Sequence, residues 1–325
     1  MIHYDNFSHW ALYVKYLYTQ KSLQTLPSGK NLSYFSYPPG SALFVYHFLE
    51  SVGYSEHHIV LGQELLIFSV LSGLYSGIQK PKNWLSPLVI TGFIMMIALW
   101  NAEIHIYNLL GDVLIFLTFL GVFIGMRSFQ RSIWSLIFFF VITVMFLSLI
   151  KTSVLFFVGV LVCYYLNQFL TICPKKRFVL GVILSVALTF VPRYLWTVCI
   201  NYHFSDMVWA HGIKMDILKD TGLIKQVLAH FITTYFSLKY LLNIALLVTL
   251  LLGIVALLVI RKKSLIKHFY FCLLVYGGYM LGLLGMYLTS IPISEALEIA
   301  GYERYYLTMV LILMGIVIYF FLTVY

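Results

Sequence analysis

Long apolar runs separated by short polar segments make up most of the chain. About 20 consecutive apolar residues are needed to cross the hydrocarbon core of a bilayer as a helix. Runs of about this length lie near residues 58–79, 84–100, 107–126, 133–149, 152–172, 178–199, 239–260, 267–289 and 305–324. They lack the strict apolar–polar alternation of membrane β-strands. The pattern therefore predicts an all-α polytopic membrane protein with about nine transmembrane helices.

A shorter apolar stretch, "PPGSALFVYHFLESVGY", begins at Pro38. It is marginal as a span, and proline is favoured in the first turn of a helix, so it predicts a half-inserted or interfacial helix. Only 10% of the residues are charged, whereas soluble domains carry about 25%. Lipid must therefore be the solvent for most of one membrane domain, residues 1–325. We expect an extracytoplasmic loop (1–57), six spans (58–200), a second extracytoplasmic loop (201–238) and three spans (239–325).

The charge of the loops predicts the orientation of the spans. Four loops are basic: "KPK" (80–82), "RSFQR" (127–131), "PKKR" (174–177) and "RKKSLIK" (261–267). Basic loops normally stay in the cytoplasm, and placing all four there lets the nine spans alternate without exception. The C-terminus is then cytoplasmic in the cell membrane. The net charge of +9 reflects this orientation signal and does not indicate a nucleic-acid partner.

The orientation raises a question about the N-terminal segment. Residues 1–57 are predicted to be extracytoplasmic, yet residues 1–40 lack the apolar core of a signal peptide. The simpler expectation is a further span before Met1 in the natural protein. The alternative is that residues 1–40 cross as a short tail drawn by the next helix.

Ionisable residues outside the basic loops collect on the predicted outer side. Asp112 lies about one turn inside its span, and Arg193 lies about two turns inside another. A charge within a span costs at least a few kcal/mol, so such groups usually face a cavity and have a function. The other candidates on this side are Asp5, His9, Tyr37, Glu103, His105, Lys151 and Arg304. We therefore predict a polar, aromatic-rich pocket on the extracytoplasmic face.

The residue types in this pocket suit the transfer of a group from a phosphate leaving group. Asp5 would accept the proton of an acceptor hydroxyl as the general base. The cations Lys151, Arg193 and Arg304 would neutralise the departing phosphate. Tyrosine and tryptophan rings would stack on sugar rings.

Four short motifs resemble those of bacterial GT-C glycosyltransferases. They are "YDNFSHW" (4–10), "YPPG" (37–40), an acid near the start of a later span, and "ERYY" (303–306). The resemblance implies a polyprenyl-phosphate-linked sugar donor, an envelope-glycan or lipid-linked acceptor, an inverting transfer and a transmembrane helix before the first motif. It also implies that Asp5 is the catalytic base, that Glu103 or Asp112 is a second acidic site, and that Arg304 contacts the lipid phosphate. Many relatives have two acids where this chain has Asp5 and Asn6, which weakens the case for a metal at that pair.

Several candidates have structural interpretations as well. Asp5 could cap the helix that follows it, with His9 as a hydrogen-bonding orienter, and "YPPG" could be a rigid turn around Tyr37. Glu103 and His105 alternate, which is compatible with a divalent-cation site together with Asp5 and also with a wet loop.

The remaining candidates also have two interpretations each. Asp112 could pair with a neighbouring helix. Lys151 could mark a tight hairpin or extend its amine to the membrane interface. Arg304 could form an ion pair with Glu303.

Three other functions compete with a glycosyltransferase. A flippase for lipid-linked oligosaccharides would need polar residues at mid-span and an internal repeat, which the sequence does not show. A polysaccharide polymerase or ligase would depend more on outer-loop arginine and histidine, and a non-catalytic scaffold would tolerate loss of Asp5. An amphipathic stretch around 215–232 would lie on the membrane and form one wall of the pocket, where acceptor specificity would reside.

Overall fold

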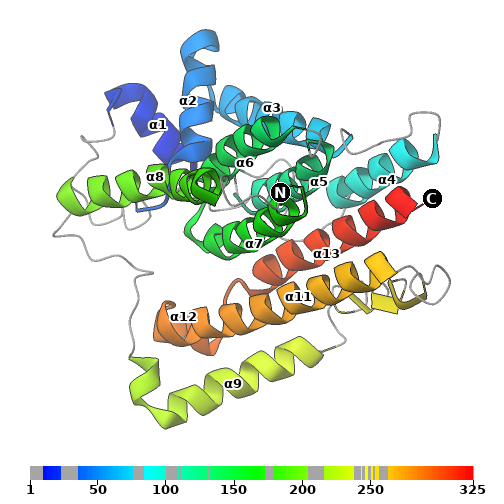
Figure 1. Ribbon diagram of the computed structural model, residues 1–325. Coiled ribbons are helices and arrows are strands. Elements are labelled where there is room, and N and C mark those ends of the chain that lie inside the picture. Colours follow the sequence, from blue (N-terminus) through cyan, green and yellow to red (C-terminus); the bar gives the residue numbers. More distant parts are fainter. Residues whose placement is uncertain are drawn as a thin grey trace. The chain divides into compact units, whose positions relative to one another are not determined.

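All regular elements in the described part of the chain are helices, as the computed structural model in Figure 1 shows. The structure describes residues 10–22, 36–75, 84–99, 109, 111–129, 132–172, 179–203, 216–237, 263–324 and single positions within 243–255. This confirms the all-α fold class. The chain divides into two compact units, Met1–Met207 and Val208–Tyr325, and the division falls within the predicted loop 201–238.

Six helices in the described residues are long and apolar enough to cross a membrane: Glu56–Tyr75, Gly111–Ser128, Thr152–Leu170, Val179–His203, Phe269–Thr289 and Tyr302–Tyr319. Two shorter apolar helices cover Ser86–Ala98 and Ile133–Ser148. These eight helices correspond to eight of the nine predicted runs. The ninth run, 239–260, lies mostly outside the described residues. The chain is a multi-pass membrane protein.

The first unit is a helical bundle built around one central helix. Its elements are α1 (Ala11–Gln20), α2 (Gly40–Val52), α3 (Glu56–Tyr75), α4 (Leu85–Leu99), α5 (Gly111–Ser128), α6 (Ile133–Ser148), η2 (Thr152–Val154), α7 (Leu155–Ile172) and α8 (Val179–His203). Helix α5 packs against α3, α6 and α7, while α8 packs on α6 (Figure 1). The stretch that begins at Pro38 forms α2, which packs on α1 and α3.

Close packing holds this bundle together. Nearly every side chain of α5 is buried, including the rings of Phe116, Phe119 and Phe123. Lipid tails are as apolar as leucine, so membrane helices associate through tight packing, and small residues permit the closest approach. Gly125 of α5 is such a residue, because a Cβ atom there would lie 2.4 Å from the ring of Phe139 in α6. Helix α8, in contrast, leaves much of its apolar surface exposed, as expected for contact with lipid.

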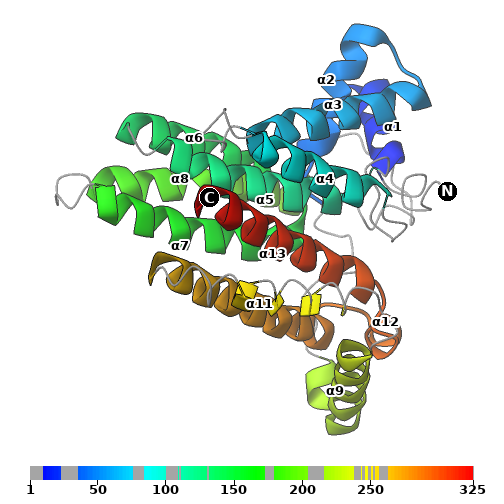
Figure 2. The same ribbon diagram turned by 90° about the vertical axis from the view of Figure 1, so that its right-hand side faces the viewer.

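The second unit contains η4 (Ile217–Lys219), α9 (Thr221–Phe236), α11 (Lys263–Thr289), α12 (Ile293–Leu297) and α13 (Tyr302–Val324). Helices α11 and α13 pack side by side, and α9 packs on α11 and α12 (Figure 2). Helix α9 occupies much of the predicted amphipathic stretch. The Asp220 carboxylate caps it by accepting hydrogen bonds from the backbone N–H groups of Gly222 and Leu223.

A strained turn joins α12 to α13. The N–H of Ala300 donates to the carbonyl of Glu295, and the N–H of Ile299 donates to that of Ala296, which is the Schellman pattern at a helix end. Ile299 occupies the left-handed position with φ of +52°. Glycine usually fills this position, because a β-branched side chain is strained there. The hydroxyl of Tyr287 donates to the carbonyl of Ala300 at 2.8 Å and so ties this turn to α11.

Candidate functional site

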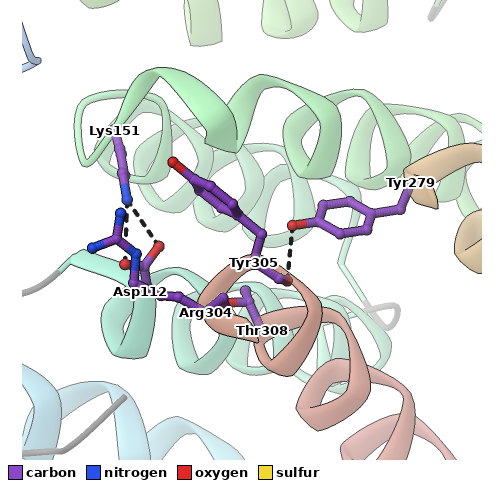
Figure 3. A network of polar contacts seen from close by, with 6 residues as sticks. All are labelled: Asp112, Lys151, Tyr279, Arg304, Tyr305 and Thr308. Atoms are coloured by element: carbon purple, nitrogen blue, oxygen red, sulfur yellow. Dashed lines mark hydrogen bonds and ion pairs between the residues drawn. The ribbon is translucent and has the colours of Figure 1, made fainter. Parts of the chain in front are cut away.

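A buried ion pair links two helix ends in the first unit. Asp112 lies in the first turn of α5, and Lys151 precedes η2 at the corner between α6 and α7. The Lys151 Nζ atom lies 3.0 and 3.2 Å from the two carboxylate oxygens of Asp112 (Figure 3). The side chains are only 7% and 2% exposed, respectively. An acid is favoured at a helix N-terminus, and each buried charge compensates the other.

Arg193 of α8 is connected to this ion pair through Thr152. Its Nη2 atom donates to the hydroxyl oxygen of Thr152 at 3.0 Å, and Thr152 directly follows Lys151. Its Nη1 atom is buried and has no hydrogen-bond partner among the described residues. A guanidinium carries five N–H donors and stays charged, so a buried N–H on it that has no partner can donate a hydrogen bond to an anionic ligand.

The "SYPPG" turn meets the same corner. The indole N–H of Trp196, three residues after Arg193 in α8, donates to the carbonyl of Ser36 at 3.1 Å. The N–H of Gly40 donates to the carbonyl of Leu149 at 2.8 Å. A Cβ atom at Gly40 would lie 2.7 Å from that carbonyl oxygen, so the close approach of the two backbones requires glycine.

Aromatic residues line this turn. The rings of Tyr37 and Trp10 are stacked with centroids 5.8 Å apart and planes 11° apart. Trp10 is buried and Tyr37 is partly exposed. In the neighbouring helix α1, burial and, to a smaller extent, Cys199 raise the pKa of Tyr13, which keeps that phenol neutral.

Four predicted site residues are thus brought to one end of the first unit: Tyr37, Asp112, Lys151 and Arg193. Sequence reasoning missed Thr152 and Trp196, which connect them. The spacing offered a signal for Trp196, because residues three apart on a helix share a face. For Thr152 the signal was only its place after Lys151.

Arg304 belongs to the second unit. It lies in the first turn of α13, with its guanidinium carbon 5.4 Å from the centroid of the Tyr305 ring. Its backbone carbonyl accepts a hydrogen bond from the Thr308 hydroxyl at 3.0 Å. The Tyr279 hydroxyl donates to the carbonyl of Tyr305 at 2.9 Å (Figure 3). The hydrogen bond from Tyr279 joins the first turn of α13 to α11.

The other predicted site residues, Asp5, His9, Glu103 and His105, lie outside the residues that the structure describes. Within the described ranges, no three histidine, cysteine, aspartate or glutamate side chains gather in a way that could hold a metal ion. A divalent cation at Asp5, Glu103 and His105 therefore stays a prediction.

Comparison of the chain with protein-family models, with curated proteins and with solved structures finds no match in any of the three.

Proposed function

We propose that the protein is a membrane glycosyltransferase that moves a sugar from a polyprenyl-phosphate-linked donor to an envelope-glycan or lipid-linked acceptor on the extracytoplasmic face. The observation that carries this proposal is the gathering of Asp112, Lys151 and Arg193 at one end of the first unit. Charges within membrane helices are costly and are usually kept for function.

The charge balance of this cluster favours an anionic ligand. Lys151 is compensated by Asp112. The Arg193 guanidinium has no carboxylate within ion-pair distance in the described part of the chain, and the one hydrogen bond that it donates there goes to a neutral hydroxyl. A phosphoryl group is a natural partner for a guanidinium, which can bind two of its oxygens at once.

In the proposed reaction, Asp5 takes the proton from the acceptor hydroxyl. The acceptor oxygen forms a bond to the anomeric carbon as the bond from that carbon to the phosphate oxygen breaks. The bonding electron pair leaves with the polyprenyl phosphate, whose charge Arg193 stabilises. A single displacement inverts the anomeric configuration, and Asp112 keeps Lys151 in position throughout.

The aromatic residues beside the cluster suit a sugar substrate. Tyr37 lies on the turn that contacts α8, and its ring is backed by the buried ring of Trp10. The acceptor would be selected by the segment 201–238, and a divalent cation held by Asp5, Glu103 and His105 would add positive charge near the donor.

The test is sugar transfer from a radiolabelled polyprenyl-phosphate donor pool in membranes that contain the full chain. Asp5→Asn should lower the rate by about 100-fold or more, as expected for loss of a general base. Asp216→Asn is the matched control, because it makes the same change at an exposed residue paired with Lys219. Equal transfer by wild type and Asp5→Asn would contradict the catalytic assignment. Transbilayer movement of the donor without any product would favour a flippase.

A further inference from the structure

Arg193 is hydrogen-bonded to a corner of the chain in which the sequence assigned a candidate role to Lys151 but none to Thr152. The corner is formed by Lys151, Thr152 and the short helix η2, between α6 and α7. Two interactions hold Lys151, the first residue of this corner. Its side chain pairs with Asp112, and its backbone carbonyl accepts a hydrogen bond from the N–H of Val154 at 3.3 Å. The next residue, Thr152, presents its hydroxyl to Arg193.

We infer that Thr152 is a positioning residue, which orients the Arg193 guanidinium so that its Nη1 edge receives the phosphoryl group of a lipid-linked ligand. The identity of this ligand rests on the proposed function. The Asp112–Lys151 pair fixes the corner, the corner fixes the Thr152 hydroxyl, and that hydroxyl fixes one edge of the guanidinium.

Two properties of these groups support the assignment. The guanidinium is planar, so anchoring Nη2 also determines where Nη1 lies. Thr152 is β-branched and has few side-chain rotamers, so its hydroxyl is a stiff anchor. In the described residues Nη1 is buried without a hydrogen-bond partner, and a ligand oxygen would satisfy it.

The test is equilibrium retention of radiolabelled polyprenyl phosphate by the purified full chain in phosphatidylcholine nanodiscs. This binding assay involves no sugar transfer, so it is independent of the proposed activity. We expect Arg193→Gln to weaken retention by at least about 10-fold and Thr152→Val to weaken it by about 3- to 10-fold. Thr152→Ser restores the hydroxyl and should bind within about 2-fold of wild type. Thr143→Val is the matched control, because in the described part of the chain the Thr143 hydroxyl donates only to carbonyls of its own helix α6.

Three results would overturn the inference. One is retention by Thr152→Val equal to that of wild type, and another is a loss in Thr152→Ser as large as that in Thr152→Val, with both variants folded by thermal unfolding. The third is inorganic phosphate binding as tightly as the lipid, which would contradict a lipid-linked ligand. If the expected binding series is obtained but wild type transfers no sugar, the proposed function fails while the positioning role of Thr152 stands.

Discussion

The two units bury polar groups of different kinds. The first unit buries an ammonium and a carboxylate at one end of its helices, with a guanidinium beside them. The second unit buries phenols that donate to neutral acceptors: Tyr276 to the Tyr235 hydroxyl, Tyr279 to the Tyr305 carbonyl and Tyr287 to the Ala300 carbonyl. A hydrogen-bonded phenol is far less costly to bury than a charge. Packing therefore accounts for the tyrosines of the second unit, whereas charges within membrane helices, such as those of the first unit, are usually kept for function.

Breaking the buried ion pair tests this difference between the two units most strongly. Lys151→Met leaves the Asp112 carboxylate buried without this cation, and we expect a loss of about 3–5 kcal/mol in the free energy of unfolding. The double variant Asp112→Asn/Lys151→Met removes both charges and should be less destabilised than Lys151→Met alone. Thermal unfolding of these two variants and of the single variant Asp112→Asn, all purified in detergent, measures the losses. A double variant whose loss equals the sum of the two single losses would show that the charges do not interact.

A second prediction concerns the backbone approach that brings the "YPPG" turn to the charged corner. Gly40→Ala places a Cβ atom against the Leu149 carbonyl and should cost about 1–3 kcal/mol of stability. Gly159→Ala in α7 is the control, because a Cβ atom there meets nothing within 4 Å. Equal unfolding midpoints for the two variants would argue against the close contact between α2 and the corner.

In the second unit, single hydroxyl deletions should have smaller effects. Tyr287→Phe removes the donor to the Ala300 carbonyl beside the strained Ile299 turn, and we expect a loss of about 1 kcal/mol. Tyr270→Phe on the same helix α11 should change little, because that side chain is 62% exposed. The unfolding midpoints of both variants check this. A loss at Tyr287 as large as that of Lys151→Met would remove the contrast between the units.

The smallest effect is expected at the exposed ion pair of the first unit. Lys21 Nζ lies 3.1 Å from the Glu50 carboxylate, and this hydrogen bond, together with the charge of Glu50, raises the pKa of Lys21. A raised lysine pKa means that the stabilisation is fully present below the ordinary pKa of 10.5 and is lost as the pH rises through the higher, folded-state value. Near neutral pH, wild type should therefore have a slightly higher thermal unfolding midpoint than Lys21→Met. The two midpoints should converge as the pH rises above the folded-state pKa of Lys21. A difference between the two midpoints that grew as the pH rose would contradict the expected loss of stabilisation.

The hydropathy pattern predicted where the helices lie in the sequence, but it did not predict which helices pack together. The runs near 107–126 and 152–172 correspond to α5 and α7, and the stretch from Pro38 corresponds to α2. The ion pair between Asp112 and Lys151 joins residues 39 positions apart. Nothing in the local pattern specifies which helix ends meet, because lipid-facing and packed surfaces are equally apolar.

Local propensity also gave no signal at one position. The left-handed residue that ends α12 is Ile299, where a glycine or asparagine would have signalled the turn. The Tyr287 hydroxyl and the burial of Ile299 stabilise this turn, and both depend on tertiary packing. Sequence reasoning had no access to either contact.

The proposed reaction requires the charged end of the first unit to face the outside of the cell. This can be measured by labelling single cysteines in intact cells with a membrane-impermeant maleimide, after replacing the native cysteines with serine. Ser36→Cys lies on the turn that contacts the charged corner, and Ser132→Cys is the same substitution at the exposed start of α6, beside the basic loop 127–131. We expect Ser36→Cys to be labelled in intact cells and Ser132→Cys to be labelled only after permeabilisation. The reverse pattern would place the charged end in the cytoplasm and contradict the proposed extracytoplasmic reaction.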